Sequence, residues 1–431
     1  MAASFLAKCA TLAFAQRFVK AWMLCACRGF TFTVRSVHFN WPGIKSRQGF
    51  SAYNERKRGM LKIAGAKVFK NGEFVEGDIF IEGDRIVAAG DEAPEVIDAK
   101  GLLAIPGLVD VHSHGAVGHD FCDGTHESID AITRYEASRG VTAWCGTTMT
   151  FPEEKLAGIM QCAAEHVDAP DAAALVGINM EGPFISPEKV GAQNPAYVQQ
   201  CDAAMFRRLQ NASGGKIKLV DIAPEEPGAL EFVDELHDDV RISVAHTCAN
   251  YDQAAEAFRR GAKHVTHLYN AMPGLHHRKP GVIPAALEAG ATPEIIADGV
   301  HIHPAMVRLA FSMFGAERMI LISDSMEATG MPDGEYSLGG QAVTKNGSHA
   351  TLHDGTLAGS ATDLMGCMKV AATEMGLPLE VAVRAATENP ARAIGVFDER
   401  GSLDAGKIAD MVLLDADLNV AGVILRGKRI R

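Results

Sequence analysis

Short apolar runs alternate with longer amphipathic segments through most of the 431-residue chain. The short runs are rich in Val, Ile and Ala, which is typical of buried strands, whereas the longer segments repeat apolar residues at the helical period. Strands that alternate with helices predict βα units around a parallel sheet. Eight strands are predicted, at 107–112, 141–147, 174–180, 217–222, 241–245, 264–267, 294–297 and 319–323.

Helices are expected between and after these strands. Eight βα units fit a closed (β/α)8 barrel of the TIM type, which accommodates about 250 residues or more in one domain. An open, doubly wound sheet is the competing topology, but no Gly-x-Gly-x-x-Gly sequence follows an early strand. We therefore predict an α/β barrel over residues 106–395. The predicted helices lie at 126–139, 203–212, 251–260, 284–288, 304–314, 363–375 and 379–386.

The two ends of this region carry a different pattern. Residues 60–105 contain short β-rich runs separated by turn signals, of which Asn71-Gly72 is typical of a hairpin. Strand-like runs return near the C-terminus. We predict an antiparallel β unit over residues 60–105. Because chain termini often lie close together in a domain, we predict that residues 60–105 and 396–431 form one small β-domain.

Residues 1–59 differ in charge from the remaining chain. They carry ten Lys or Arg side chains and one acid, Glu55, although the whole chain has a formal net charge of −12. A basic, acid-poor segment is typical of an organelle presequence; it also fits sequence upstream of a true start at Met60, which we favour. Charges interrupt it too often for a membrane span. We expect this leader to be disordered or absent from the mature fold.

The overall charge and the cysteines narrow the class of protein. An acidic balance disfavours a general nucleic-acid-binding function. The nine cysteines are scattered without a Cys-x-x-Cys pair, as expected for the reduced thiols of a cytoplasmic protein. We therefore expect neither nucleic acid nor membrane as a partner.

Candidate metal ligands stand at the ends of five predicted strands. His112 and His114 close the first strand, and residues i and i+2 of a strand point to the same face, so both imidazoles can bind one ion such as Zn²⁺. Strand ends meet at one rim of a (β/α)8 barrel. Each side chain alone is an ordinary polar residue, but six at one rim indicate a site for one or two divalent ions. The other four are Glu181, able to bridge, His246, His267 and Asp324.

This ligand set predicts metal-assisted hydrolysis of an amide or similar bond. A divalent cation lowers the pKa of a bound water to about 7 and polarises a carbonyl oxygen. Asp324 is placed to take the proton of that water and to deliver one to a leaving amine. His301 follows the seventh strand toward the same rim, so we expect it to contact the substrate. Zn²⁺ is the expected metal, with Fe, Co or Mn as alternatives.

The sequence around these residues forms longer motifs. They read Pro-Gly-Leu-Val-Asp-Val-His-Ser-His-Gly (106–115), Met-Glu-Gly-Pro-Phe-Ile-Ser-Pro (180–187), Thr-His-Leu-Tyr-Asn-Ala-Met-Pro (266–273), Ala-Asp-Gly-Val-His (297–301), Ser-Asp-Ser-Met (323–326) and Gly-Ser-Leu-Asp-Ala-Gly-Lys-Ile-Ala-Asp (401–410). The first and last resemble signatures of the whole amidohydrolase superfamily. The second and third are similar to those of one branch, the N-acetylglucosamine-6-phosphate deacetylase family.

The resemblance implies an activity and a set of metal ligands. The activity is hydrolysis of the N-acetyl group of N-acetylglucosamine 6-phosphate to glucosamine 6-phosphate and acetate, by attack of a metal hydroxide with Asp324 as acid/base. The matching ligands are, for the principal metal of the family, Glu181, His246 and His267 and, for a second site in binuclear members, His112, His114 and Asp324.

The resemblance also implies substrate contacts and a homodimer. Asn270, Ala271 and His301 match substrate-binding positions. Arg278 matches an arginine that reaches the phosphate of the substrate in the neighbouring subunit, a task that suits its planar guanidinium. One position departs from the family: Gln193 stands where a His near the substrate carbonyl is usual. Its amide can donate a hydrogen bond but cannot carry charge.

Three alternatives stay open. The same reaction on N-acetylgalactosamine 6-phosphate is one. A cyclic-amide hydrolase of the dihydroorotase or hydantoinase kind is another, but these enzymes usually have a carbamylated Lys at the end of strand four, where this chain reads Val-Asp-Ile-Ala-Pro (220–224). The third, a metal-free binding protein, is disfavoured because all six ligands are present.

Overall fold

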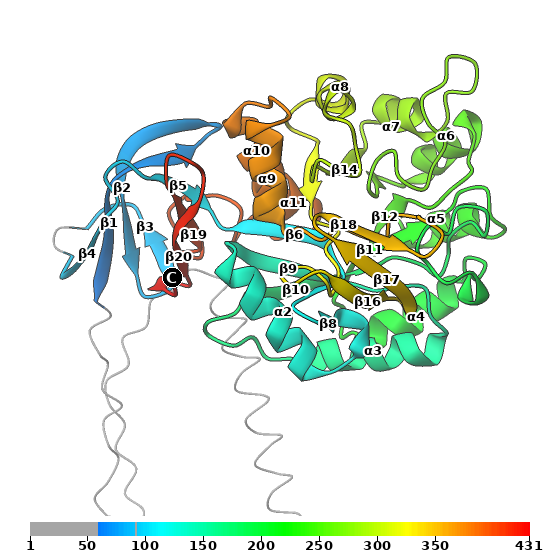
Figure 1. Ribbon diagram of the computed structural model, residues 1–431, viewed down its shortest axis with the longest axis horizontal. Coiled ribbons are helices and arrows are strands. Elements are labelled where there is room, and N and C mark those ends of the chain that lie inside the picture. The colour runs from blue at the N-terminus through cyan, green and yellow to red at the C-terminus, as the bar shows by residue number, and fades with distance from the viewer. Residues whose placement is uncertain (1–58, 91–92) are drawn as a thin grey trace, which may run out of the picture. The chain divides into compact units, whose positions relative to one another are not determined.

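A computed structural model describes residues 59–90 and 93–431. Eight strands form its main sheet, each parallel to the next, in an order that follows the chain. The backbone N–H of Asp324 donates to the carbonyl oxygen of His112 (2.9 Å), which joins the last strand to the first. The predicted strands and the (β/α)8 barrel are confirmed (Figure 1). The strands are β6 (Leu108–Ser113), β9 (Val141–Thr147), β10 (Ala174–Met180), β11 (Ile217–Ile222), β12 (Arg241–Val244), β13 (His264–Val265), β14 (Thr292–Ile296) and β15 (Ile320–Ile322).

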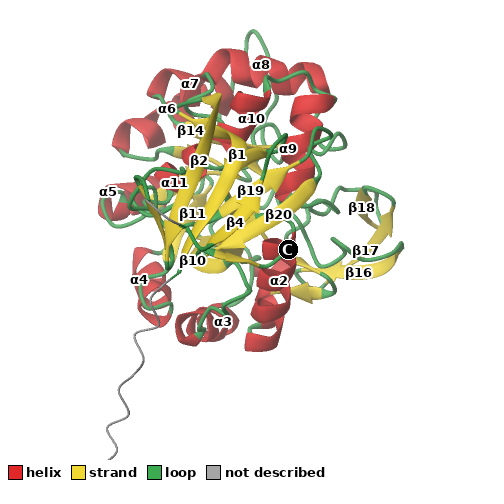
Figure 2. Ribbon diagram, turned by 90° about the vertical axis from the view of Figure 1, so that its left-hand side faces the viewer, coloured by secondary structure: helices red, strands yellow, loops and turns green. Residues whose placement is uncertain are grey.

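Helices surround these strands, as Figure 2 shows. They are α2 (His126–Ser138), α3 (Glu153–Glu165), α4 (Ala203–Ala212), α5 (Ala229–Leu236), α6 (Tyr251–Arg260), α7 (Val282–Ala289), α8 (Pro304–Phe314), α9 (Leu364–Thr373), α10 (Leu379–Ala386) and α11 (Glu388–Ala393). The predicted helices are confirmed, while α3, α5 and α11 are absent from the prediction. Helix α6 illustrates why these segments are helical. Asn250 and Gln253 form a capping box at its start, and Ala254, Ala257 and Phe258 make its buried face.

One end of the barrel is closed by packing. Val109, Leu219 and Ile322 fill the barrel interior with apolar side chains, and α11 packs against them. Asn389 of α11 donates from its side chain to the carbonyl oxygen of Met319, just before β15 (2.7 Å). The end at which the strands begin is therefore covered, and the end at which they finish is left for a site.

Strands from both ends of the described chain form a second sheet, so the predicted joining of the two ends is confirmed. Its strands are β1 (Met60–Lys70), β2 (Glu73–Glu82), β3 (Arg85–Val87), β4 (Glu95–Asp98), β5 (Leu103–Pro106), β19 (Met411–Leu414), β20 (Val420–Leu425) and β21 (Lys428–Arg429). The prediction of an antiparallel unit over residues 60–105 holds for β1, β2 and β3 and is wrong for β4 and β5, which pair parallel to β1. Tight hairpins make β1, β2 and β3 antiparallel, whereas the longer connection after β3 lets the chain return in the direction of β1.

A small antiparallel sheet after β15 is also absent from the prediction. It consists of β16 (Gly334–Leu338), β17 (Gln341–Asn346) and β18 (His349–Leu352). Gly339 and Gly340 make the first turn with φ of 60° and 82°, a backbone region that glycine adopts without strain. The side chain of Gln341 donates to the carbonyl oxygen of Ala192, so this sheet is tied to the loop after β10.

Some predictions are not tested by the fold. The leader, residues 1–59, lies outside the described residues apart from Gly59. The domain limits, 60–105 with 396–431 and 106–395, stay a prediction. Within the described part of the chain, no helix has both the length and the hydropathy needed to cross a bilayer.

Candidate metal centre

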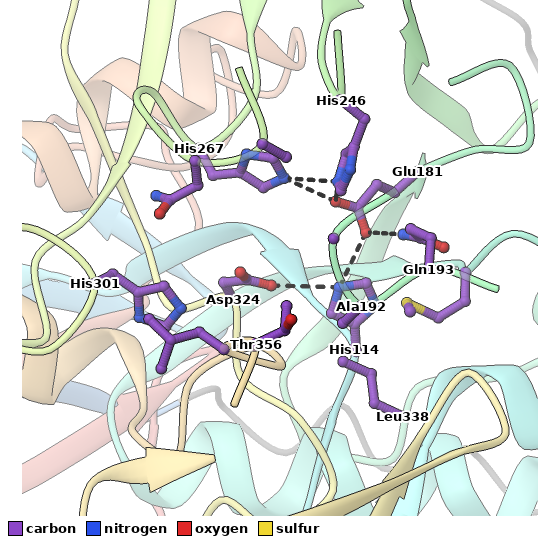
Figure 3. Close-up of a pocket in the computed structure, with 16 residues that line it drawn as sticks. His114, Glu181, Ala192, Gln193, His246, His267, His301, Asp324, Leu338 and Thr356 are labelled. Atoms are coloured by element: carbon purple, nitrogen blue, oxygen red, sulfur yellow. Dashed lines mark hydrogen bonds and ion pairs between the residues drawn. The ribbon is translucent and has the colours of Figure 1, made fainter. Parts of the chain in front are cut away.

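The six predicted ligands lie where β6, β10, β12, β13 and β15 end. The backbone has a positive φ at three of them, with 42° at His246, 29° at His267 and 49° at Asp324. Residues with a Cβ adopt such angles only where the surrounding structure holds them, often at functional sites. These turns direct the three side chains across the mouth of the barrel toward the other ligands (Figure 3).

Glu181, His246 and His267 form the first of two compact groups. The Nε2 atoms of His246 and His267 both lie 3.0 Å from Oε1 of Glu181 and 3.1 Å from each other. Two imidazole nitrogens at this distance need a proton or a cation between them. Ligand atoms around a tetrahedral Zn²⁺ with bonds of about 2.0–2.2 Å lie about 3.3–3.6 Å apart, so this triangle is a few tenths of an ångström smaller than the one that such an ion requires.

His112, His114 and Asp324 form the second group. Oδ1 of Asp324 lies 3.6 Å from Nε2 of His112 and 3.3 Å from Nε2 of His114. Glu181 stands between the groups: its Oε1 faces the first, and its Oε2 lies 3.2 Å from Nε2 of His114 (Figure 3). One carboxylate oxygen directed at each group is the arrangement of a bridging ligand.

The donor atoms of both groups fit divalent cations. Imidazole nitrogens and carboxylate oxygens are ligands that suit Zn, Fe, Co and Mn. Nε2 of His112 is buried and makes no hydrogen bond to any described residue, although it faces the other ligands. Such an unpaired buried atom is costly unless something binds it. A cation at this position accounts for it.

Charge pairing keeps the carboxyl groups of the site ionised. Burial alone raises the pKa of Glu181, but the surrounding imidazoles, His112 foremost, hold it well below its ordinary value. Burial also opposes ionisation of Asp324, but the hydrogen bond to His114 and the charges of His112 and His114 together outweigh it and leave that pKa lowered. In turn, burial lowers the pKa of His114, whereas Asp324 and Glu181 raise it, to about 9. The ligand set therefore favours positive charge, as a cation site requires.

A cavity of about 230 Å³ opens over both groups. Leu338 of β16, together with Thr356 and Leu357, forms a wall that the sequence does not predict. His112 lies below the cavity floor, fully buried. Among the described residues that line the cavity, none is Lys or Arg. Nine predicted site residues line it: His114, Glu181, Gln193, His246, His267, Asn270, Ala271, His301 and Asp324.

Arg278 is the one predicted site residue that lies apart. It is exposed, in the loop between β13 and α7. Its Nη1 lies 2.6 Å from Nε2 of the neighbouring His277. Within one chain, therefore, the structure does not bring Arg278 to the cavity.

Gln193 is buried beside the metal ligands rather than free in the cavity. Its Nε2 donates to Oε2 of Glu181 (2.7 Å), and its Oε1 accepts from the backbone N–H of Thr150 (2.6 Å). These two hydrogen bonds fix the orientation of the amide. One of its two N–H hydrogens binds the carboxylate of Glu181, which faces both ligand groups.

His301 is oriented by a carboxylate. Its Nδ1 lies 2.7 Å from Oδ2 of Asp298, which also accepts from two backbone N–H groups through Oδ1. Burial lowers the pKa of His301, but the hydrogen bond to Asp298 and the charges of Asp298 and Asp324 together outweigh it and leave this pKa above its ordinary value. In its protonated form, which Asp298 favours, the imidazole presents Nε2 to the cavity as a hydrogen-bond donor.

The sequence reasoning missed the residues behind His112. Glu294 of β14 and His264 of β13 are buried and hydrogen-bonded to each other, and Glu294 also contacts Nδ1 of His112. A signal was present, since Glu294 is an acid in the apolar run Glu-Ile-Ile-Ala (294–297). Acids are rarely buried unless they are paired.

With this site in view, sequence comparison defines the class of protein. The chain belongs to the amidohydrolase family, whose model matches residues 103–430. It is 37% identical over 374 residues to the N-acetylglucosamine-6-phosphate deacetylase of Bacillus subtilis (strain 168), in an alignment that covers 84% of this chain and 94% of the relative. It is 34% identical over 349 residues to the N-acetylgalactosamine-6-phosphate deacetylase of Escherichia coli O157:H7, which covers 80% of this chain and 92% of that one.

Solved structures of enzymes with the same name superpose on this chain. The N-acetyl-D-glucosamine-6-phosphate deacetylase of Mycobacterium smegmatis superposes with a TM-score of 0.80 at 34% identity, covering 86% of this chain and 100% of that one. A mutant of that enzyme has been solved in complex with N-acetyl-D-glucosamine-6-phosphate, again with a TM-score of 0.80. The enzyme from Pasteurella multocida superposes with a TM-score of 0.81 at 27% identity, over 86% of this chain and 99% of that one. This chain is a hydrolase of that fold and family.

Proposed function

We propose that this chain is a metal-dependent deacetylase that hydrolyses N-acetylglucosamine 6-phosphate to glucosamine 6-phosphate and acetate. The observation that supports this most is Glu181, which joins two groups of metal ligands at the floor of a cavity of about 230 Å³. The relatives that share this activity match the chain over nearly their whole length. The reaction is the hydrolysis of a linear amide.

The proposed cofactor is one or two divalent cations, Zn²⁺ first, with Fe, Co or Mn as alternatives. Two ions are favoured because Glu181 offers one oxygen to each group. A bound divalent cation supplies a water of lowered pKa and polarises the carbonyl oxygen of the N-acetyl group. The ligands would be Glu181, His246 and His267 in one group and His112, His114 and Asp324 in the other.

Asp324 is the proposed acid/base. It lines the cavity at the end of β15, and its lowered pKa keeps it ionised at neutral pH. An ionised carboxylate can accept the proton of the attacking water and pass it to the nitrogen of the leaving amine. When the C–N bond breaks, the acetyl group and the oxygen of the attacking water leave as acetate, and the sugar leaves with a free amine.

Substrate contacts are proposed from the cavity walls. Asn270 and Ala271, just after β13, would contact the sugar, and His301 would donate to the phosphate through Nε2. Gln193 has a second amide hydrogen besides the one that binds Glu181, and this hydrogen would reach the substrate carbonyl. A neutral amide polarises that carbonyl less than a charged imidazole would.

The cavity offers the phosphate the imidazole of His301, but no guanidinium or ammonium group of the described chain. No Lys or Arg lines the cavity in the described chain, whereas Arg278 is exposed on a loop. We propose a homodimer in which Arg278 of each subunit binds the phosphate of the substrate in the other, because guanidinium groups bind phosphate in a bidentate manner.

We also propose that the protein works in the cytoplasm. The six cysteines of the described chain are all free. Reduced thiols are usual in that compartment, where disulfides are rare.

Acetate release decides between the candidate substrates. Metal-loaded protein is assayed with N-acetylglucosamine 6-phosphate, and with N-acetylgalactosamine 6-phosphate as the second candidate, which one relative supports. Hydantoin and dihydroorotate release no acetate on hydrolysis, so loss of the cyclic amide by ring opening tests the cyclic-amide alternative. We expect the highest kcat/KM with N-acetylglucosamine 6-phosphate; turnover of a cyclic amide alone would refute the proposal.

A further inference from the structure

Glu294 connects a metal-ligand histidine to a second histidine deeper in the barrel. Its Oε2 lies 3.0 Å from Nδ1 of His112, and its Oε1 lies 3.0 Å from Nε2 of His264. The side chains of all three are 0% exposed. They come from β14, β6 and β13, so only the closed barrel brings them together.

The positions of the protons in this row of hydrogen-bonded side chains follow from Arg241, which lies at the end away from His112. Nε of Arg241 lies 3.2 Å from Nδ1 of His264, and a guanidinium can only donate, so this Nδ1 accepts. A neutral His264 then carries its proton on Nε2 and donates it to Oε1 of Glu294. Oε2 of Glu294, which also accepts from the backbone N–H of His267 (3.3 Å), is left to accept from Nδ1–H of His112, and Nε2 of His112 keeps a lone pair.

His112 differs in this respect from the other three ligand histidines. Nδ1 of His246 lies 2.8 Å from the carbonyl oxygen of Lys189, a neutral acceptor. Nδ1 of His114 and Nδ1 of His267 have no hydrogen-bond partner in the described chain. His112 is thus the one ligand imidazole of the described residues whose Nδ1 faces a carboxylate, and it belongs to the group with His114 and Asp324.

We propose that Glu294 is a positioning residue for this second group of ligands. By accepting from Nδ1 of His112 it fixes the ring orientation and the tautomer, so that Nε2 is ready to bind a cation. His264 and Arg241 in turn hold Glu294 in the required orientation. Carboxylates behind ligand histidines commonly change metal affinity about 10–100-fold. The inference rests on the cation of the proposed function and not on its substrate.

A Co²⁺ titration of the metal-free protein, without substrate, tests this. Visible absorption reports the coordination of each ion, and His112→Asn identifies the step that belongs to the second group. We expect two steps in the wild-type protein, and in Glu294→Gln a loss of about 10–100-fold in affinity at the second-group step alone. The matched control is Asp221→Asn. Asp221 is a buried residue of β11 whose Oδ1 accepts a hydrogen bond from the hydroxyl of Thr266 (2.8 Å) and not from a ligand histidine.

Two His264 variants keep the test decisive if Glu294→Gln does not fold. His264→Gln retains a donor for Oε1 of Glu294 and should bind both ions as the wild type does. His264→Phe removes the donor and should weaken the same step as Glu294→Gln, by a smaller factor. Unchanged affinity in Glu294→Gln and His264→Phe, equal losses at both steps, or uptake of one Co²⁺ only by the wild type would each overturn the proposal. A protein that shows the expected titration but releases no acetate would instead contradict the proposed function alone.

Discussion

Nε2 of Gln193 donates a hydrogen bond to Oε2 of Glu181 across 2.7 Å, so a side chain expected beside the substrate also holds the carboxylate between the two ligand groups. The backbone N–H of Thr150 fixes the other end of the amide. Gln193 therefore connects the loop after β10 to the metal centre. A change at this position should affect the ligands as well as the substrate.

Replacing Gln193 with Leu should lower kcat/KM for the proposed substrate about 10–100-fold, because Oε2 of Glu181 loses its donor. Gln193→His should keep more activity than the Leu variant, since an imidazole can donate to the same oxygen. Steady-state acetate release and metal content measure both effects. Gln200→Leu is the control, because Gln200 is exposed. Equal activity of wild type and Gln193→Leu would contradict the role given to this hydrogen bond.

The Asp324→Asn variant should lose about 10²–10⁴ in kcat, the usual contribution of a positioned acid/base. KM should change far less, because the cavity walls remain. Asp333→Asn serves as control, since Asp333 is exposed and its carboxylate accepts a hydrogen bond from the backbone N–H of Gly347, away from the cavity lining. A raised KM with an unchanged kcat would show that Asp324 binds substrate and transfers no proton.

The pair of Asp298 and His301 should make stability depend on pH. Burial raises the pKa of Asp298, but His301 outweighs this and lowers it, so its contribution is present above about pH 4 and is lost as pH falls. The pKa of His301 is raised, so its contribution is complete below about pH 6.5 and is lost as pH rises through the raised value. The Tm difference between wild type and His301→Gln should therefore be larger at about pH 5.5 than at about pH 9. A difference that is the same at both pH values would rule out this charge pairing.

Metal removal should destabilise the fold. A ligand that binds only the folded protein adds about 2.7 kcal/mol at 100 times its Kd. Chelation should lower Tm, and Zn²⁺ should restore it. In Glu181→Gln, which weakens both groups, the metal-dependent part of the Tm shift should shrink strongly. A chelator that leaves the wild-type Tm unchanged would argue against resident cations.

Arg278→Ala should raise KM for the phosphorylated substrate and leave kcat for its non-phosphorylated analogue unchanged. If Arg278 acts across a dimer, mixing and re-forming dimers from Arg278→Ala and Asp324→Asn should give a higher kcat/KM for the phosphorylated substrate than either variant has alone. Half of the sites in a mixed dimer then combine an intact Asp324 with an intact arginine from the other subunit. Lys279→Ala is the neighbouring control. No recovery in dimers shown to have exchanged would place Arg278 outside the partner's site.

The barrel could be predicted because its strands are covered on both faces. Buried parallel strands are continuous apolar runs in the sequence. Such a run can be recognised even where the strand observed in the structure is very short, as for β13 (His264–Val265). The sheet β16–β18 has partly exposed strands and no sustained alternation, so its pattern resembles that of a loop. Its contribution to the cavity, Leu338, could not be anticipated for the same reason.

The ligands could be predicted from their position at strand ends, whereas their supporting contacts could not. His112 and Glu294 lie 182 positions apart, and their contact depends on the closure of the barrel. The backbone of His246 and His267 turns through a positive φ, which the sequence does not indicate. Strand ends define which side chains meet, and the fold defines how each one is held.

Acetate release from N-acetylglucosamine 6-phosphate, measured on one preparation before metal removal, after it and after reconstitution, tests the central claim most directly. We expect turnover in the first and third states and none in the second, together with the loss of turnover in Glu181→Gln under all three conditions. Equal turnover by the metal-free and the reconstituted protein would contradict the account.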